Sequence, residues 1–266
     1  MAFQLEDINF KTVADPKGFI EEGDQAYKDR VAKAADKIIS NRDKSPIVLL
    51  SGPSGSSKTT TSMKIAEELN RRGIGTHYIG MDDYFKTIDD NSPRTPEGDL
   101  DLESPLCLDM ELMNRHFDML PKGERIYVPK YEFARRMRSL TPSKSIQLKK
   151  DEVVIVEGIH AFYDARLRAM MDLKLYMHVE SDICLLRRIQ RDINERGRQI
   201  DNISSQYITT VKPMFDQYIR NYEQYADVIV AGGGKDAKIT EILAGYINND
   251  LHLYRGLNRR RDEKNA

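Results

Sequence analysis

Short apolar runs alternate along the chain with longer segments in which apolar residues recur every three or four positions. Residues 47–50 and 153–156 are wholly apolar, which is typical of strands buried on both faces of a parallel sheet. Further strands are expected at residues 76–81, 173–179 and 228–230. Because strands alternate with helical segments, we predict an α/β fold with a mostly parallel sheet flanked by helices.

Helical periodicity predicts six helices. They are expected at residues 21–40, 59–72, 110–120, 182–196, 203–225 and 238–249. Gly73 and Pro121 are expected to end the second and third of them, and Pro213 to kink or break the fifth. The first helix carries an apolar face, made of Tyr27, Val31, Ala34, Ala35 and Ile38.

Two stretches between these elements lack a long helical or strand pattern. Residues 86–105 hold acids among proline and glycine and are expected to form a loop. Residues 126–148 alternate short β-like pieces with a basic turn, which predicts a hairpin-like flap. The polar tail, residues 255–266, is expected to fray.

Composition excludes several classes of protein. The chain has 266 residues, 41 Lys+Arg and 42 Asp+Glu, and 40% hydrophobic residues, as expected for a globular protein. A near-neutral charge argues against a protein built to hold nucleic acid, and no apolar run approaches the ~18 residues of a membrane span. Acids in the first ten residues argue against a secretory signal. Cys107 and Cys184 lack metal spacing and fit reduced thiols, so we expect a cytoplasmic location.

A glycine- and serine-rich segment between a predicted strand and a predicted helix is the strongest chemical signal. The candidate nucleotide-binding residues in it are Gly52, Pro53, Ser54, Gly55, Ser56, Ser57, Lys58, Thr59 and Thr60. Such a loop lets backbone amides and a helix N-terminus converge on phosphate, while a lysine reaches the outer phosphates and a hydroxyl holds Mg²⁺. Ser57 stands where the usual pattern has its second glycine. A simple Ser/Gly turn is the alternative, and the flanking elements favour the phosphate loop.

Acidic residues follow two of the predicted strands. Glu157 follows the strand at 153–156, and Asp82 and Asp83 follow the strand at 76–81. Ligands of open α/β sheets gather at these strand ends, and phosphoryl transfer needs both a metal-side carboxylate and a base for the acceptor hydroxyl. We therefore expect Thr59 and Glu157 beside Mg²⁺ and a base at Asp82 or Asp83, although each acid taken singly could be a solvated strand-end residue.

An arginine-rich run occupies residues 187–198, with five arginines and two acids. A salt-bridged helix face exposed to solvent is one interpretation. Beside a phosphate loop, a lid over the γ-phosphate is the other, in which guanidinium groups offset developing charge and Gly197 lets the chain turn.

These motifs together resemble the uridine kinase/phosphoribulokinase family of P-loop kinases. The resemblance spans residues 46–231, is carried most specifically by Arg191-Asp192-Ile193-Asn194-Glu195-Arg196-Gly197-Arg198, and is nearest to the uridine–cytidine kinase branch. It implies transfer of the γ-phosphate of ATP or GTP to a nucleoside 5′-hydroxyl, with Mg²⁺. By position it assigns catalytic roles to Asp82 (the base and a neighbour of Mg²⁺), Lys58, Arg191 and Arg196, with Thr59 and Glu157 as the other metal-binding residues. It assigns nucleotide binding by the lid to Arg188, Arg191, Arg196 and Arg198.

The resemblance also implies an acceptor site, in which this sequence departs from the family pattern. The expected acceptor-binding residues are Asp82, Tyr84, Glu103, Tyr131, Arg136 and Arg191. Glu103 stands where the family has a ribose-binding Asp, and Asp101 competes for that role. The base-reading His of the flap is absent, and Arg136 is nearest its place.

The implied organisation has three parts. They are an N-terminal extension with a helix (1–45), a kinase core (46–235) with a flap (121–150) and an arginine-rich lid (187–200), and a C-terminal helix with a polar tail (236–266). The N-terminal helix could cover a sheet edge or form a contact in a homo-oligomer. The expected partner is a small hydroxyl acceptor, foremost a nucleoside such as uridine or cytidine, and neither nucleic acid nor a membrane.

Two alternatives remain at this point. The acceptor could be another small hydroxyl compound, as in the phosphoribulokinase and pantothenate kinase branches, and Arg135, Arg136 and Arg138 would suit an anionic one. The irregular loop at Ser57 and the missing histidine would also fit a nucleotide-binding regulator that has lost catalysis.

Overall fold

A computed structural model describes residues 10–11, 14–42, 45–171 and 173–231 of the chain. Contacts divide the chain into two units, Met1–Asp29 with Gly233–Ala266, and Arg30–Gly232. All of the candidate site residues belong to Arg30–Gly232. The helix predicted at 238–249 and the polar tail lie outside the described residues.

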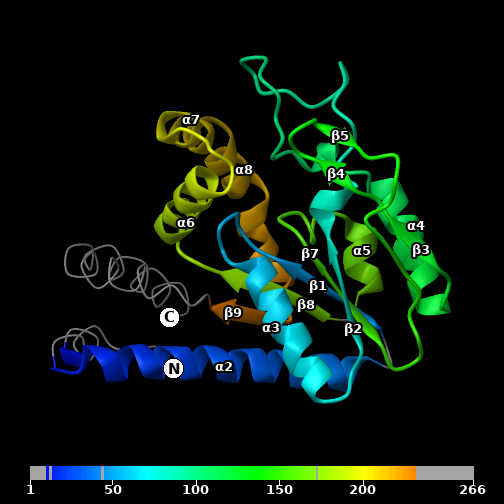
Figure 1. The fold of residues 1–266 in the computed structure, drawn as a ribbon, viewed down its shortest axis with the longest axis vertical. Coiled ribbons are helices and arrows are strands. Elements are labelled where there is room, and N and C mark those ends of the chain that lie inside the picture. Colours follow the sequence, from blue (N-terminus) through cyan, green and yellow to red (C-terminus); the bar gives the residue numbers. More distant parts are fainter. Residues whose placement is uncertain (1–9, 12–13, 43–44, 172, 232–266) are drawn as a thin grey trace, which may run out of the picture. The chain divides into compact units, whose positions relative to one another are not determined.

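The central sheet is parallel throughout and has the strand order β2-β7-β1-β8-β9 (Figure 1). These strands are β1 (Ile47–Ser51), β2 (Thr76–Gly80), β7 (Val153–Glu157), β8 (Leu173–His178) and β9 (Val228–Ala231), so all five predicted strands are confirmed. Every residue of β1 and β7 is buried, as their unbroken apolar sequences predicted for strands covered on both faces.

The register of the sheet aligns the strand ends on which the predicted site depends. Glu157 at the end of β7 lies opposite Leu50 of β1 and opposite Gly80 of β2. Ser51 of β1 lies opposite Tyr176 of β8. The segments that follow β1, β2 and β7 therefore leave the sheet at one edge, where parallel strands place ligands.

The early helices match the sequence pattern closely. Helix α2 (Pro16–Asn41) contains the predicted helix at 21–40, and its residues Val31, Ala34, Ala35 and Ile38 are buried. Helix α3 (Lys58–Arg71) ends one residue before the prediction, with Gly73 at φ +81°. Helix α4 (Met110–Met119) gives way to a 3-10 turn, Leu120–Lys122, that contains Pro121. The short helix α5 (Ala165–Met170) was not predicted.

The helical segment after β8 is more broken than its sequence pattern suggested. Helix α6 (Ser181–Asn194) is followed by α7 (Ile200–Gln206), a π-helical turn (Tyr207–Val211), α8 (Lys212–Gln217) and a 3-10 segment (Ile219–Tyr225). Pro213 lies in the first turn of α8. Because proline lacks an N–H and its ring clashes with the carbonyl four residues earlier, the chain widens just before it rather than continuing as one α-helix.

The predicted flap is a pair of short antiparallel ladders. Strand β3 (Ile126–Val128) pairs with β6 (Lys144–Ile146), and β4 (Tyr131–Glu132) pairs with β5 (Met137–Arg138) between them. Ile126, Val128 and Ile146 are buried in the main hydrophobic core, which fixes the base of the flap. Among the described residues, none of the helices has the length and apolar character that a bilayer crossing requires.

Candidate active site

The loop between β1 and α3 is packed so closely that two of its residues must be glycine. Gly52 and Gly55 have positive φ angles of +153° and +85°. A Cβ atom on Gly55 would lie 2.3 Å from the backbone oxygen of Cys184 in α6, and one on Gly52 would lie 2.7 Å from Cβ of Met177 in β8. The loop is therefore seated against β8 and the first turn of α6.

Ser57 adopts a left-handed backbone conformation, which favours glycine. Its φ and ψ are 65° and 32°, in the left-handed region, and its side chain makes no capping hydrogen bond to α3. Helix α3 begins at the next residue, so the loop ends on a helix N-terminus whose dipole attracts anions. Serine carries a Cβ atom, so its backbone is strained in the left-handed region. The loop therefore has its conformation at the cost of strain in Ser57.

Two side chains of the loop face its interior. Lys58 Nζ donates to the backbone oxygen of Pro53 at 2.9 Å. Ser56 Oγ is buried without a hydrogen-bond partner among the described residues. A lysine folded over the loop and an orphaned hydroxyl inside it fit a cradle whose remaining partner is a phosphate. Thr60 is exposed on the first turn of α3.

Glu157 lies directly beside the first turn of α3. Its Oε1 atom accepts hydrogen bonds from Thr59 Oγ1 at 3.0 Å and from the Tyr78 hydroxyl at 2.7 Å. Burial, reinforced by the Glu157 carboxylate, raises the pKa of Tyr78, so the phenol stays protonated and donates. The structure thus brings Thr59 and Glu157 together, and Tyr78 of β2 holds Glu157 in place.

Asp82 lies in the 3-10 turn η1 (Met81–Tyr84) that follows β2. Solvent reaches this residue, but the surrounding protein displaces much of its hydration. This desolvation, together with the nearby Glu157 carboxylate, raises the pKa of Asp82 to about 6, and Lys58 opposes the increase. Asp83 instead faces the flap, where Ser143 Oγ lies 3.5 Å from its Oδ2 atom.

The oxygen atoms gathered here fit a magnesium ion. Mg²⁺ prefers hydroxyl and carboxylate oxygens, usually with one or two carboxylates completed by substrate phosphates and water. Thr59, Glu157 and Asp82 offer that donor set beside the phosphate loop. Within the described ranges, groups of three or more His, Cys, Asp or Glu side chains suited to a metal are absent.

Of the two acids considered for acceptor binding, Glu103 faces the arginine-rich helix and Asp101 does not. Arg188 Nη1 lies 3.1 Å from Glu103 Oε1 and 3.2 Å from Ser54 Oγ, and Arg188 Nη2 donates to Gln206 Oε1 at 3.2 Å. Asp101 is buried and accepts from the backbone N–H of Glu103 at 3.2 Å. Asp101 therefore shapes the turn that presents Glu103.

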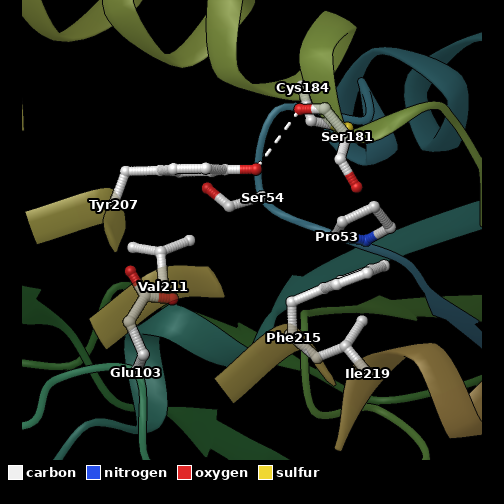
Figure 2. A pocket seen from close by; sticks show the side chains of 9 residues that line it. All are labelled: Pro53, Ser54, Glu103, Ser181, Cys184, Tyr207, Val211, Phe215 and Ile219. Carbon is white, nitrogen blue, oxygen red and sulfur yellow. Dashed lines mark hydrogen bonds between the residues drawn. The ribbon is translucent and has the colours of Figure 1, made fainter. Parts of the chain in front are cut away.

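A pocket beside Glu103 lies between the phosphate loop and the helical segment that follows the lid. Figure 2 shows Pro53 and Ser54 of the loop on one side and Phe215 and Ile219 on another. Glu103, Ser181, Cys184, Tyr207 and Val211 complete its lining. The Tyr207 hydroxyl donates to the backbone oxygen of Ser181 at 3.4 Å, which ties the π-helical turn to the start of α6.

The predicted lid folds around one buried carboxylate. Asp192 of α6 is 0% exposed. Four arginines lie within ion-pair distance of it, at 3.8 Å for Arg188, 3.0 Å for Arg191, 3.2 Å for Arg196 and 3.3 Å for Arg198. Gly197 adopts φ +61°, as expected for the residue at which the chain reverses. The arginine-rich run is therefore not a simple solvated helix face. Four of its arginines form one ion-pair network around Asp192.

The arginines around Asp192 also interact electrostatically with Asp82, through Arg196. The carboxylate of Asp82 acts on the pKa of Arg196, although desolvation is the largest effect on that guanidinium and lowers its pKa. Asp82 is likewise influenced by Lys58, Glu157 and Glu103. Asp82 therefore interacts electrostatically with Lys58 of the phosphate loop, with Glu103 of the turn at 101–104 and with Arg196 of the lid.

Tyr84, predicted to bind the acceptor, lies in the core instead. It is 0% exposed, and its hydroxyl lies 2.8 Å from His116 Nδ1. In a 3-10 turn, residues three apart share a face, and here Tyr84 shares the buried face of Met81. Phe85, which follows the turn, is partly buried against the core. The ring of Phe85 lies 5.3 Å from that of Tyr131, between centroids.

The flap contributes two rings, Tyr131 and Phe133, to an aromatic group with Phe85, and it exposes the side chain of Arg136. Phe133 completes the group, with its ring centroid 5.0 Å from Tyr131 and 6.0 Å from Phe85. Arg135 pairs with Glu132 and Arg138 with Asp109. Arg136 is exposed at the turn, with φ +52°, and no carboxylate of the described residues is paired with it.

Sequence reasoning missed several of these residues. Asp192 was expected only as one of two acids in the arginine-rich run, and Gln206 was not among the expected site residues. Phe85 was not expected in the site, although it follows Tyr84 and its ring packs against that of Tyr131. Tyr78 carries no local signal, because its role depends on the register of β2 against β7.

Known proteins resemble the chain over most of its length. The model of the phosphoribulokinase/uridine kinase family matches residues 47–238. A uridine kinase of Limosilactobacillus reuteri (strain DSM 20016) is 35% identical over 216 residues, which cover 81% of this chain and 96% of the relative. A uridine kinase of Pectobacterium atrosepticum is 38% identical over 207 residues, covering 76% of this chain and 94% of the relative.

Solved structures share the fold at low sequence identity. A protein described as a possible uridine kinase from Bacillus stearothermophilus has a TM-score of 0.57 at 19% identity, covering 76% of this chain and 97% of that one. YFH7 from Saccharomyces cerevisiae has a TM-score of 0.59 at 12% identity, covering 77% and 99%. With the phosphate loop, the acidic strand ends and the arginine lid in their expected order, the chain belongs to the phosphoribulokinase/uridine kinase family of P-loop kinases.

Proposed function

We propose that the chain is an ATP- or GTP-dependent kinase that phosphorylates the 5′-hydroxyl of a nucleoside such as uridine or cytidine. The observation that carries the proposal is the position of Asp82, within electrostatic reach of Lys58 and Glu157 on the phosphate side and of Glu103 on the acceptor side. The uridine kinases that resemble the chain are matched over 94–96% of their length.

In this reaction the acceptor oxygen forms a bond to the γ-phosphorus while the bond between that phosphorus and the β–γ bridging oxygen breaks. The acceptor proton passes to the Asp82 carboxylate, which is mostly ionised at neutral pH because its pKa is about 6. Lys58, Arg191 and Arg196 offset the charge on the transferring phosphoryl group. Mg²⁺, held through Thr59, Glu157 and Asp82, would neutralise charge on the β- and γ-phosphates.

The acceptor side fits a ribose joined to a planar base. Glu103 presents a carboxylate that Arg188 holds in place at 3.1 Å, and carboxylates accept well from vicinal hydroxyls. In the aromatic group of Phe85, Tyr131 and Phe133, Tyr131 is buried and Phe133 is 54% exposed, so Phe133 is the ring most open to stacking with a base. A role in nucleoside salvage in the cytoplasm is part of the proposal, and it agrees with two buried, unpaired cysteines.

A second candidate acceptor is a small hydroxyl compound that carries a phosphate or carboxylate. The observation that favours it is Arg136, an exposed cation beside the aromatic group, whereas its neighbours Arg135 and Arg138 are already paired with acids. A free guanidinium suits an oxyanion.

An ADP-release assay with a panel of nucleosides and sugar phosphates, run with ATP and with GTP, tests the proposal. We expect turnover with nucleosides, and we expect Asp82→Asn to lower kcat by about 10²-fold or more while nucleotide affinity is retained. Asp83→Asn is the matched control, since this neighbouring acid faces Ser143, and its kcat should stay near that of the wild type.

The other outcomes are equally definite. Turnover confined to anionic acceptors would replace the nucleoside by the second candidate. ATP binding without transfer to any acceptor would make the protein a nucleotide-binding regulator. Near-normal kcat in Asp82→Asn would exclude Asp82 as the base.

A further inference from the structure

A buried histidine outside the predicted site lies between the acceptor turn and the segment that follows the lid. His160 comes three residues after Glu157 and is 2% exposed. Its Nε2 atom lies 2.7 Å from the backbone oxygen of Glu103, and its Nδ1 atom lies 3.0 Å from the hydroxyl of Tyr222. Both ring nitrogens are therefore engaged, and neither contact belongs to the reaction described above.

The partners determine the protonation state of the ring. A backbone carbonyl only accepts hydrogen bonds, so Nε2 carries the proton and donates to Glu103. Burial lowers the pKa of His160, which keeps the imidazole neutral and leaves Nδ1 to accept from the Tyr222 hydroxyl. Rings of Tyr163, Tyr218 and Tyr222 surround it at centroid distances of 5.9–6.2 Å, so the imidazole has little freedom to turn.

Glu103 is thus held from two directions. Arg188 of α6 binds its carboxylate at 3.1 Å, and His160 binds its backbone oxygen at 2.7 Å. The turn formed by residues 101–104 lacks a regular element of its own, and an unanchored turn would let the Glu103 carboxylate move by more than a catalytic geometry tolerates. We propose that His160 is a positioning residue, which fixes the acceptor-binding Glu103 through its backbone and is itself oriented by Tyr222.

The chemistry explains why this position holds a histidine rather than an apolar residue. A leucine would fill much of the same volume but would leave the Glu103 carbonyl and the Tyr222 hydroxyl without partners in a buried place. The imidazole satisfies both groups at once and connects the chain after β7 to the 3-10 segment Ile219–Tyr225. The segment that follows β7 therefore holds this turn through His160, three residues after Glu157.

The inference rests on the proposed function for its kinetic test and on the fold alone for its second test. We expect His160→Leu to raise the acceptor KM about tenfold, the effect of losing one buried hydrogen bond and leaving its partner unsatisfied. The Kd for ATP should be unchanged, and kcat should change less than about threefold. His160→Gln, whose amide N–H can replace Nε2–H, should keep KM within about threefold of the wild type.

Hydrogen–deuterium exchange supplies the readout that does not need turnover. In His160→Leu, amides of residues 101–107 should exchange about tenfold faster, while those of residues 52–60 keep wild-type rates. His116→Leu is the matched control, because His116 makes a similar buried contact with Tyr84 at 2.8 Å but does not touch Glu103. If His160→Leu fails to fold, Tyr222→Phe takes its place, with faster exchange of the same amides as the expected result.

Unchanged exchange at 101–107 in the folded variants would overturn the inference, whether or not a nucleoside is the acceptor. Equal increases of the acceptor KM in His160→Leu and His116→Leu would overturn it as well. Absence of turnover by the wild type with every nucleoside would overturn the proposed function alone, since the exchange experiment would still report on His160.

Discussion

The loop at Ser57 shows how one residue can keep a function while straining the backbone. A left-handed conformation costs a residue with a Cβ atom about 1–2 kcal/mol, and φ of 65° places Ser57 there. The side chain makes no capping bond that would repay this cost. Strained residues of this kind persist at sites where the surroundings over-determine the backbone, and the close packing of Gly52 and Gly55 does so here.

Replacing Ser57 by glycine should therefore stabilise the protein. Relief of strain exceeds the extra entropy that glycine gives the unfolded chain, so we expect Ser57→Gly to raise the free energy of unfolding by ~0.5–1 kcal/mol in urea titrations. Affinity for ATP should be equal to or higher than that of the wild type. Ser57→Ala is the control and should not gain stability, since it keeps the Cβ atom. A large loss of ATP affinity in Ser57→Gly would assign the hydroxyl a role of its own.

The lid helix illustrates how an element can be organised by a single buried charge. Like charges of four guanidinium groups would drive the lid apart without a counter-charge, and Asp192 is in contact with all four. Arg191 and Arg196 are thus fixed in place before a nucleotide arrives, which lowers the reorganisation needed during transfer.

Neutralising this carboxylate should loosen the lid. Removing one partner from a buried ion pair costs about 3–5 kcal/mol, so Asp192→Asn should lower the free energy of unfolding by about 3 kcal/mol and reduce kcat more than about tenfold. Urea titration and steady-state kinetics measure the two effects. Asp201→Asn, an exposed acid in the first turn of α7, should change stability by less than about 1 kcal/mol. Equal effects of both substitutions would contradict a central role for Asp192.

The end of β8 carries a pH-dependent contact. His178 lies 3.8 Å from Glu180 and 3.1 Å from Glu223. The carboxylate of Glu180, together with that of Glu223, raises the pKa of His178 to about 9. Because the folded-state pKa exceeds the unfolded value of about 6.5, the contribution to stability is complete below pH 6.5 and is lost as the pH rises through about 9.

His178→Gln should remove this pH dependence. The difference in Tm between wild type and variant should be largest near pH 6 and should disappear by pH 10, as measured by differential scanning calorimetry in matched buffers. A Tm difference that stays constant across this range would mean that His178 is not charged in the folded protein.

At the scale of the whole molecule, the unit Arg30–Gly232 brings residues from distant parts of the chain to one edge of its sheet. Thr59 and Glu157 are separated by 98 positions and lie 3.0 Å apart, and Arg188 and Glu103 are separated by 85. Figure 1 shows two groups above the strands of the sheet in this view, helices α6, α7 and α8 and the flap strands β4 and β5. A ligand that spans these parts must stabilise the unit as a whole.

Nucleotide binding should therefore be visible in thermal unfolding. ATP with Mg²⁺ at about 100 times its Kd should stabilise the protein by about 2.7 kcal/mol, and chelation of the metal should remove most of this gain. Glu157→Gln should reduce the Mg²⁺-dependent part and leave the Tm shift with ATP in EDTA unchanged. An identical Tm shift with and without Mg²⁺ would exclude a metal held between the nucleotide and Thr59, Asp82 and Glu157.

The strands, the phosphate loop and the lid segment could be predicted from the sequence because each depends on local chemistry. A wholly apolar run such as 47–50 is stable only when covered on both faces, and Gly52, Gly55 and Lys58 belong to a loop whose backbone demands are local. The break near Pro213 was predictable for the same reason, although its π-helical form was not. The roles of the individual site residues remain predictions, which the geometry now makes specific.

What tertiary structure alone decided are the pairings between distant segments. Tyr84 lies in the core because the 3-10 turn places it on the buried face of Met81, three residues earlier. Glu103 rather than Asp101 meets Arg188, because Asp101 is buried under its own turn. Tyr78, Asp192 and His160 gain their roles from sheet register and from charges or carbonyls far away in sequence. Local patterns carry information about backbone conformation, whereas a hydrogen bond across 50–100 positions depends on the packing of the whole core, which no short stretch of sequence encodes.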